Sequence, residues 1–417
     1  MRKIEYQRFE LKNGLRVIIH EDASIPKAAV NLIYRVGSKD EAPHLTGFAH
    51  LFEHLMFRGS KHIPSFDRPL EEVGGQNNAS TSADVTHYYI NLPANQLETA
   101  FWLESDRMLE LAFSEEGLEK EKSVVIEEYK QRYLNQPYGD AYLKIREMAY
   151  QVHPYQWNPI GKDMSHIEQA TLQDVKDFFY GFYAPNNATL VVAGDVKTSK
   201  VLKQVEKWFG DIPSRTLKKH VLPVEPKQTE AREATVYGDV PFPAVYKMYH
   251  MPAHGERGYY VADLLADILA YGKSAILPQY MVREKKVSPN ASAFTWGLHD
   301  PGVMSVDGRL AKGISVAQYE KTLAEAFDQI FDLTPQDLER IKGKLAAVFV
   351  MNQMTVGSTA NRLAHADVLG NPGLINETPE IYQSISLKEV KAAAEQILAP
   401  TNCSTLYYLP KSDSASS

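Results

Sequence analysis

The sequence predicts an α+β protein made of two homologous domains, each an antiparallel sheet covered by helices. The first observation is an internal repeat, in which Thr171 opens a helix that stops before Pro185 and the strand 190–193 follows. Ser386 and Pro400 begin and end the same arrangement, and the proline again follows the hydroxyl residue by 14 positions. Because a hydroxyl N-cap and a proline mark the two ends of a helix, the chain uses one helix and strand arrangement twice.

A second internal similarity supports two domains of similar size. Residues 114–119 and 334–339 both open with a hydroxyl residue and carry acidic side chains in the first turn, as helix N-termini do. Prolines and charges interrupt the periodic pattern at 215–232, which is typical of an exposed linker. We therefore expect an N-terminal domain at 1–214 and a homologous C-terminal domain at 233–417.

The composition is that of an ordinary globular protein. Of the 417 residues 44% are hydrophobic and 23% are charged, and the net charge of −7 argues against a nucleic-acid partner. The single cysteine, Cys403, rules out an internal disulfide and is compatible with a reducing compartment. We find no apolar run of 18 residues and no signal-peptide pattern, so we expect no membrane span and a cytoplasmic protein. A periplasmic location would require that a signal peptide had been removed.

The motif His50-x-x-Glu53-His54 carries the candidate chemistry. Apolar residues recur at helical spacing from Phe48 to Met56, which predicts a largely buried amphipathic helix. Positions i, i+3 and i+4 share one face of a helix, so His50, Glu53 and His54 meet on an otherwise apolar surface.

Two imidazoles and a carboxylate on such a face fit a zinc site. Two neutral imidazoles one turn apart can both bind Zn²⁺ at about 2.0–2.1 Å, which leaves room for a third protein ligand and a water. The neighbouring carboxylate can then take a proton from that water, which zinc acidifies. The order of the residues is the inverse of the commoner His-Glu-x-x-His. Taken alone, the motif is equally compatible with two hydrogen-bonded histidines and a surface glutamate.

Further stretches along nearly the whole chain match one family of enzymes. They are residues 9–17, Gly37, Ser38 and Glu41, Arg58–Ser60, Asn78–Thr81, Thr86 and Tyr88, Glu121–Glu128, His153–Tyr155 and Pro159–Gly161. Together with the motif, they resemble the M16 or pitrilysin family of zinc metallopeptidases, in particular its short members such as mitochondrial processing peptidase. The resemblance implies bound Zn²⁺, a peptide substrate, and paired domains in a clamshell arrangement around a chamber.

The resemblance also implies the remaining residues of the metal site. In the family a glutamate on a later helix, seven positions after another acidic residue, is the third zinc ligand. Glu128 and Glu121 have that separation and share one helical face, so Glu128 is expected to bind zinc and Glu121 to orient a ligating histidine. Glu127 is the adjacent alternative, but it points about 100° away on a helix and is expected to face solvent.

The second half is expected to keep the fold without the metal. An alignment on the glycines that follow the two helices places Asp263 and Asp267 opposite His50 and His54. Neither aspartate reproduces a two-histidine site. The second domain is therefore expected to form the other wall of a cavity.

Substrate contacts are implied in both halves. Asn78 and Ala79 are expected at an edge strand near the zinc, before the strand 86–92, where an extended peptide can add through main-chain hydrogen bonds. The family's second half supplies an arginine and, seven residues later, a tyrosine near the scissile carbonyl. Arg283 matches, but Asn290 stands at the tyrosine position.

The exchange of tyrosine for Asn290 has two interpretations. Asn290 could donate a weaker hydrogen bond, which would leave a self-sufficient homodimer. Alternatively, this chain is the zinc-bearing half of a heterodimer with a paralogue that carries both the arginine and the tyrosine. We prefer the heterodimer.

The sequence therefore predicts a zinc-dependent endopeptidase that cleaves peptides or unfolded segments in an enclosed chamber. His50, His54 and Glu128 would bind the metal, Glu53 would act as general base, and Glu121 would support it. Two alternatives stay open: a non-catalytic scaffold subunit of the same fold, and a processing protease dedicated to one precursor.

Overall fold

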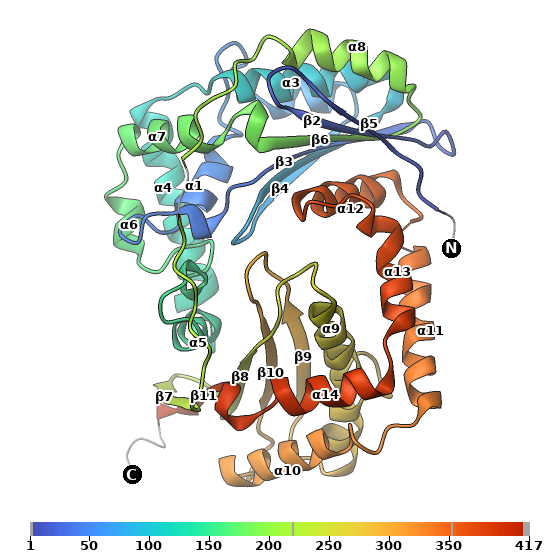
Figure 1. Cartoon of the computed structure of the whole chain (residues 1–417). Helices are drawn as coiled ribbons and strands as arrows, with labels where there is room; N and C mark the ends of the chain where they lie inside the picture. Colours follow the sequence, from blue (N-terminus) through green and yellow to red (C-terminus); the bar gives the residue numbers. More distant parts are fainter. Residues whose placement is uncertain (1–2, 219–220, 352, 412–417) are drawn as a thin grey trace. The chain divides into compact units, whose positions relative to one another are not determined.

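The structure is a computed structural model that describes residues 3–218, 221–351 and 353–411. It divides into two compact units, each built around one β-sheet (Figure 1). Unit 1 comprises Met1–Tyr129, Trp157–Leu222 and Val348–Glu377, and unit 2 comprises Lys130–Gln156, Pro223–Ala347 and Thr378–Ser417. Each unit therefore takes most of its residues from one half of the chain and a further segment from the other half.

Unit 1 contains a six-stranded sheet in the order β1-β2-β6-β3-β5-β4. β2 and β6 run parallel, and the other neighbouring pairs are antiparallel. β3 and β6 lie in the middle and are almost wholly buried, which fits their near-continuous apolar sequences. The strands are β1 (Gln7–Glu10), β2 (Arg16–Glu21), β3 (Lys27–Tyr34), β4 (Gln76–Thr81), β5 (Thr86–Pro93) and β6 (Ala188–Gly194).

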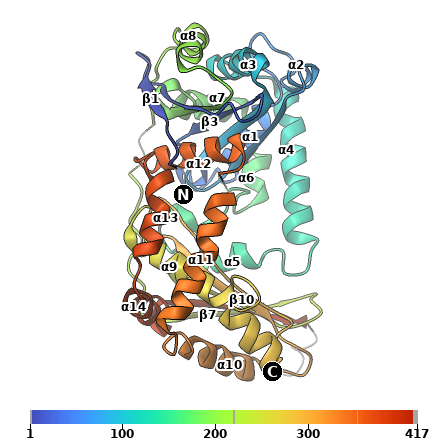
Figure 2. The same ribbon diagram turned by 90° about the vertical axis from the view of Figure 1, so that its right-hand side faces the viewer.

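Helices cover both faces of this sheet. α3 (Leu97–Leu109) and α8 (Thr198–Phe209) lie on one face, and α12 (Val356–Val368) lies on the other (Figures 1 and 2). α12 packs its Ala360 and Leu363 into a core that includes Ile33 and Val191 of the strands. The remaining helices of the unit are α1 (Phe48–Leu55), α2 (Asp67–Glu72), α4 (Glu115–Tyr129), α6 (Met164–Glu168) and α7 (Leu172–Phe182).

Unit 2 repeats the sheet with one strand fewer, in the order β7-β11-β8-β10-β9. β7 and β11 run parallel, and the other pairs are antiparallel. The strands are β7 (Arg232–Gly238), β8 (Ala244–His250), β9 (Asn290–Trp296), β10 (Val303–Arg309) and β11 (Cys403–Pro410).

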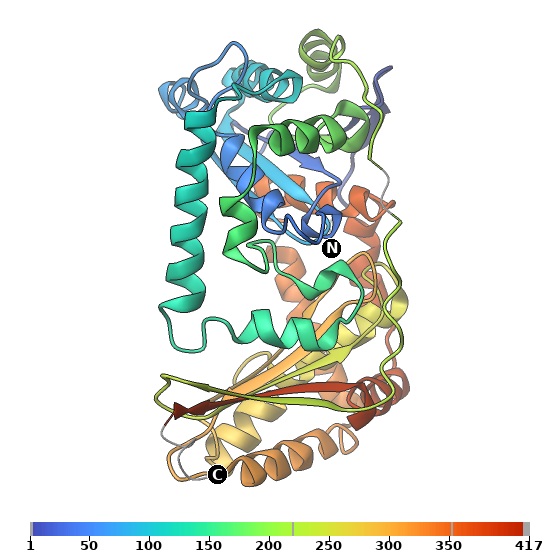
Figure 3. The ribbon, with the colours of Figure 1, turned by 90° about the vertical axis from the view of Figure 1, so that its left-hand side faces the viewer.

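Among the described residues, one α-helix of unit 2 comes from the first half of the chain. α5 (Ala141–Ala149) packs against β8 and β11 (Figure 3), as α12 of the second half packs against the sheet of unit 1. The other helices of the second half are α9 (Arg257–Ala270), α10 (Val316–Asp328), α11 (Pro335–Met351), α13 (Leu374–Ser384) and α14 (Leu387–Ile397).

The predicted internal repeat is present in the structure. Thr171 caps α7 and forms a reciprocal capping box with Asp174, and Ser386 and Glu389 do the same for α14. A short 3-10 turn beginning at a proline follows each helix, and β6 or β11 comes next. Both copies therefore run from a capped helix through a proline turn into a central strand.

The predicted fold class is confirmed, with one refinement. The sheets are mixed rather than purely antiparallel, because β6 pairs in parallel with β2 and β11 pairs in parallel with β7. In the part of the chain that the structure describes, no helix combines the length and apolar character needed to cross a membrane.

Candidate metal centre

The motif lies on α1, whose apolar side packs into an aromatic cluster. The ring of Phe52 lies 4.4 Å from that of Tyr183 and 5.9 Å from that of Phe179, measured between centroids. This packing fixes the rotation of the helix, because the apolar stripe must stay buried. The opposite side of α1 then presents His50 and His54, whose side chains are 15% and 23% exposed.

A buried carboxylate holds the start of α1 in place. Glu41 accepts hydrogen bonds from the backbone N–H groups of Gly47, at 3.0 Å, and Ala49, at 2.8 Å. These N–H groups have no partner within the helix, so Glu41 satisfies them as an N-cap residue would. Burial raises the pKa of Glu41 well above its ordinary value, although the two N–H groups favour its charged form.

Gly47 adopts a conformation that favours glycine. Its φ is +87°, and an added Cβ would lie 2.7 Å from the carbonyl oxygen of Ile160. Gly161, next to Ile160, also has a positive φ, and a Cβ added there would lie 3.1 Å from Cα of Gly47. The segment around Ile160 therefore packs directly against the N-terminus of the motif helix.

Three potential ligand atoms converge between α1 and α4. Glu128 Oε2 lies 3.2 Å from His50 Nε2 and 3.6 Å from His54 Nε2, and the ligand atoms of the three residues lie within 4.8 Å of one another. Bond lengths of about 2.0–2.1 Å in a tetrahedral site separate neighbouring ligand atoms by about 3.4 Å. Two imidazole nitrogens and one carboxylate oxygen at this spacing fit a zinc ion.

Glu121 lies behind this group of atoms. Its Oε2 is 3.3 Å from Nδ1 of His54, and its Oε1 accepts a hydrogen bond from Arg58. Burial opposes the charge of Glu121, but His54 and Arg58 outweigh this effect and lower the pKa of the carboxyl group. An ionised Glu121 holds Nδ1–H of His54 and so leaves Nε2 as the basic nitrogen that faces Glu128.

Glu53 lies beside the converging atoms without being one of them. It accepts a hydrogen bond from the hydroxyl of Thr81 at the end of β4, and its Oε2 is 3.7 Å from His50 Nδ1. The side chain is 14% exposed. Burial disfavours the charged form of His50, but Glu128 and Glu53 outweigh it and raise the pKa of His50 to about 9.

The structure also separates the two adjacent glutamates. Glu128 is partly buried and points toward His50, whereas Glu127 is exposed, as its helical position predicted. His87 is a histidine outside the motif; it is buried on β5, where it donates a hydrogen bond to Asn31.

β4 is the edge strand that the sequence predicted near the motif. It ends the sheet of unit 1, and residues Asn78 and Ala79 pair with Tyr89 and Tyr88 on its inner side. No strand of the described residues pairs with its outer side. Because Thr81 contacts Glu53, this outer edge leads directly to the candidate metal centre.

The predicted second-half residues lie in unit 2. Arg283 is near the end of a π-helix, Pro278–Glu284, and Asn290 begins β9. The metal centre belongs to unit 1, so the contact of Arg283 and Asn290 with substrate stays a prediction.

Asp263 and Asp267, which the sequence aligned with His50 and His54, both lie on α9. The order of buried and partly buried residues along 261–270 matches that along 48–57 at nine of ten positions, as this alignment requires. Thr295 of β9 donates a hydrogen bond to Asp263, and Thr81 of β4 donates one to Glu53. Each sheet therefore supplies a threonine hydroxyl to an acidic residue on the neighbouring helix.

Two family models match consecutive stretches of the chain. The first, described as insulinase (peptidase family M16), matches residues 16–156 and so includes the metal centre. The second, described as the peptidase M16 inactive domain, matches residues 169–345. Together they span well over half of the chain.

Similar proteins match over most of the length. The zinc protease PqqE of Helicobacter pylori is 29% identical over 97% of this chain and 93% of its own. An uncharacterized zinc protease, YmxG of Bacillus subtilis, is 22% identical over 94% and 95%. The crystal structure of a protease from Helicobacter pylori covers 98% of this chain and all of its own, with 29% identity and a TM-score of 0.92. A peptidase M16 inactive domain from Pseudomonas fluorescens has the same fold, with a TM-score of 0.87, 16% identity and 98% of both chains covered.

Proposed function

Since this chain belongs to peptidase family M16, we propose that it is a zinc-dependent endopeptidase whose active site is the metal centre of unit 1. The observation that carries the proposal is the convergence of His50, His54 and Glu128, with Glu53 beside them. The names of similar proteins, which include several zinc proteases, support the same activity.

His50, His54 and Glu128 would hold the metal. Zinc, when bound, acidifies a water molecule and polarises a carbonyl group. Glu121 keeps Nδ1–H of His54 engaged, so that the Nε2 lone pair stays available. Arg58 in turn holds Glu121 in its ionised form.

Glu53 would act as the general base and then as the proton donor. Its carboxylate can accept a proton from the attacking water and pass it to the leaving amine, a role that contributes about 10²–10⁴-fold to rate. The hydroxyl of Thr81 donates to Glu53 and so fixes its orientation from β4. Glu53 therefore lies at the end of β4, the strand to whose outer edge a peptide would bind.

The substrate would be a peptide or an unfolded segment. The outer edge of β4, with Asn78 and Ala79, offers main-chain donors and acceptors to an extended chain, which binds backbone without reading much sequence. Arg283 of unit 2, with Asn290 or a paralogue's tyrosine, would stabilise charge on the scissile carbonyl. We propose a dimer, with the heterodimer preferred, that encloses the substrate in a chamber.

The experiment is hydrolysis of a mixed peptide library by the purified, zinc-loaded chain, with the Glu53→Gln variant as control. We expect the variant to hold zinc yet lose about 10²-fold or more of the activity, because it lacks the general base. Cleavage by the wild-type chain without any partner protein, and none by Glu53→Gln, would favour the homodimer. If the chain is silent although it holds zinc, a paralogue should restore cleavage. Turnover by Glu53→Gln at the wild-type rate would remove Glu53 from the mechanism.

A further inference from the structure

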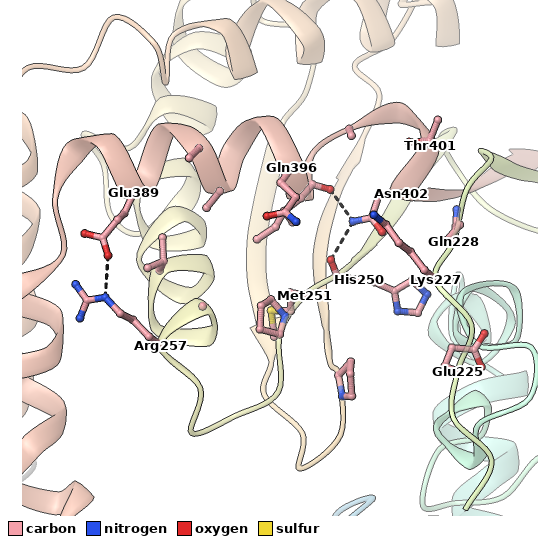
Figure 4. A pocket seen from close by; sticks show the side chains of 18 of the residues that line it. Glu225, Lys227, Gln228, His250, Met251, Arg257, Glu389, Gln396, Thr401 and Asn402 are labelled. Carbon is pink, nitrogen blue, oxygen red and sulfur yellow. Dashed lines mark hydrogen bonds and ion pairs between the residues drawn. The ribbon is translucent and has the colours of Figure 1, made fainter.

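A cavity of about 840 Å³ lies within unit 2, between α9, α14 and the segment 225–228 (Figure 4). Its volume falls in the range of about 300–1,000 Å³ that is typical of small-molecule sites. Val261 of α9 and Ala392, Ala393 and Ile397 of α14 give it apolar walls. None of its lining residues belongs to the metal centre.

The internal repeat identifies what occupies the same space in unit 1. The alignment of 48–57 with 261–270, which share their pattern of burial, places Val261 of α9 opposite Phe48 of α1. A large aromatic side chain in one copy is therefore a smaller aliphatic side chain in the other.

The second wall shows the same change. The capping residues Thr171 and Ser386 align α7 with α14, and the residues seven positions later are Phe178 and Ala393. In unit 1 the rings of Phe48 and Phe178 pack edge to face with their centroids 5.4 Å apart. In unit 2 the corresponding residues Val261 and Ala393 both line the cavity. The cavity therefore lies where unit 1 has two phenylalanine rings and unit 2 has smaller side chains.

A neighbouring proline fills the space beside Gly258. A Cβ added to Gly258 would lie 2.6 Å from Cγ of Pro252, which also lines the cavity. The proline ring therefore occupies the side-chain direction of Gly258 and closes the cavity on that side.

Polar groups lie at the two ends of the cavity. At one end Arg257 Nε donates to Glu389 at 2.7 Å (Figure 4). At the other end His250 Nε2 donates to the carbonyl of Ala149 at 2.9 Å, which leaves Nδ1 as an acceptor. Burial lowers the pKa of His250, so the imidazole is neutral at pH 7. Apolar walls with a few polar groups at the ends are typical of ligand sites.

We propose that this cavity binds an aromatic ring, carried either by a peptide side chain or by a small molecule. The ring would lie between Val261 and Ala393, where it replaces the contact that Phe48 and Phe178 make in unit 1.

The test uses the wild-type protein and three probes: N-acetylphenylalanine amide, N-acetylleucine amide and benzyl alcohol. Binding is followed by ligand-observed NMR titration. We expect saturable binding of the phenylalanine compound and at least fivefold weaker binding of the leucine compound. The variant Ala393→Phe puts the ring of unit 1 back and should weaken binding at least tenfold, whereas Ala393→Ser keeps the space open and should bind as the wild type does.

Folding is checked for each variant by its thermal unfolding. If Ala393→Phe does not fold, Ala393→Leu fills part of the space and should weaken binding by a smaller factor. Binding of both aromatic probes would identify the ring itself as the ligand, and binding of the phenylalanine compound alone would identify a peptide. Unchanged affinity in the filled variants, or no saturable binding by the wild type, would overturn the proposal. None of these measurements depends on peptidase activity, so the outcome is independent of the proposed function.

Discussion

At the scale of single residues, one position on a helix decides between a metal ligand and a surface charge. Glu127 and Glu128 are neighbours on α4 and differ by about 100° in direction. Glu128 faces His50, and Glu127 is exposed. We predict that Glu128→Gln weakens zinc binding more than tenfold, since even the loss of a group that only orients a ligand costs about 10–100-fold.

The measurement is the zinc content of the purified variants after gel filtration. Glu127→Gln is the matched control, because it removes the same charge one position away. We expect it to hold as much zinc as the wild type. The reverse result, with zinc lost only in Glu127→Gln, would show that Glu128 is not the ligand.

A second residue makes the stability of unit 1 depend on pH. His87 is 1% exposed, its Nε2 donates to Asn31 at 2.9 Å, and its ring lies 5.3 Å from that of His365. Burial, with a smaller effect of His365, lowers the pKa of His87 to about 3. Below pH 6.5 this histidine is therefore protonated in the unfolded chain but not in the folded chain. The free energy of unfolding consequently falls as the pH falls.

We predict that this histidine alone costs about 2 kcal/mol of unfolding free energy between pH 7.5 and pH 5, at about 1.4 kcal/mol for each pH unit below 6.5. The variant His87→Gln keeps a donor for Asn31 but cannot be protonated. Urea unfolding at both pH values should show a smaller acid loss in this variant than in the wild type. Equal losses of unfolding free energy in the variant and the wild type would mean that His87 is not the source of the pH dependence.

Sequence reasoning found the residues whose positions follow from helical spacing. His50, Glu53 and His54 share a face because of their spacing, and Glu128 followed from the family pattern on α4. It did not find the roles of Glu41 and Thr81. Glu41 caps α1 from a loop, and Thr81 reaches Glu53 from a strand, and no periodic pattern links such residues to a helix.

At the scale of elements, α12 is attached to the sheet of unit 1 by one buried carboxylate. Asp367 has a fully buried side chain that lies 2.9 Å from Arg35 Nη2 and 3.3 Å from both Arg16 Nε and Arg8 Nη2. It also accepts a hydrogen bond from Thr189 at 2.7 Å. Removing one member of a buried ion pair costs about 3–5 kcal/mol, because the partner charges lose their compensation.

We therefore predict that Asp367→Asn lowers the unfolding free energy by about 3–5 kcal/mol and makes α12 sensitive to limited proteolysis. Asp195→Asn is the control, since Asp195 is an exposed aspartate of the same unit. The unfolding free energy of Asp195→Asn should lie within about 0.5 kcal/mol of the wild-type value, as for most surface substitutions. A small effect of Asp367→Asn would mean that the apolar contacts of α12 suffice.

The elements differ in how well sequence predicted them. The caps at Thr171 and Ser386 were predictable because they are local, and the structure confirms both as capping boxes. The parallel pairing of β2 with β6 and the three arginines around Asp367 were not predicted. They join residues that are far apart in the chain, and no local pattern marks such a contact.

At the scale of the whole molecule, the two compact units exchange segments between the halves of the chain. α12 comes from the second half and packs against β3 and β6 in unit 1, and α5 comes from the first half and packs against β8 and β11 in unit 2. The sequence repeat indicated two similar halves but could not reveal this exchange. Repeats show that the halves are alike, not which half supplies each helix.

This exchange predicts that a fragment ending in the linker does not fold alone. Residues 1–222 lack α12, so the sheet face that carries Ile33 and Val191 would be exposed to water together with the rest of that core. A sheet with an uncovered apolar face is prone to aggregate. We expect the fragment to be insoluble or partly folded, and co-expression with residues 223–417 to restore a soluble complex.

The control is the complete chain cut after it has folded, at a protease site placed beside Val221, which is 99% exposed. The cut chain should keep its gel-filtration volume and its near-ultraviolet circular dichroism, because both exchanged helices are already in place. Fragment 1–222 would contradict this prediction if it were monodisperse and gave the native spectrum without its partner. In that case α12 would only cover a sheet that is stable without it, and the linker would be a true domain boundary.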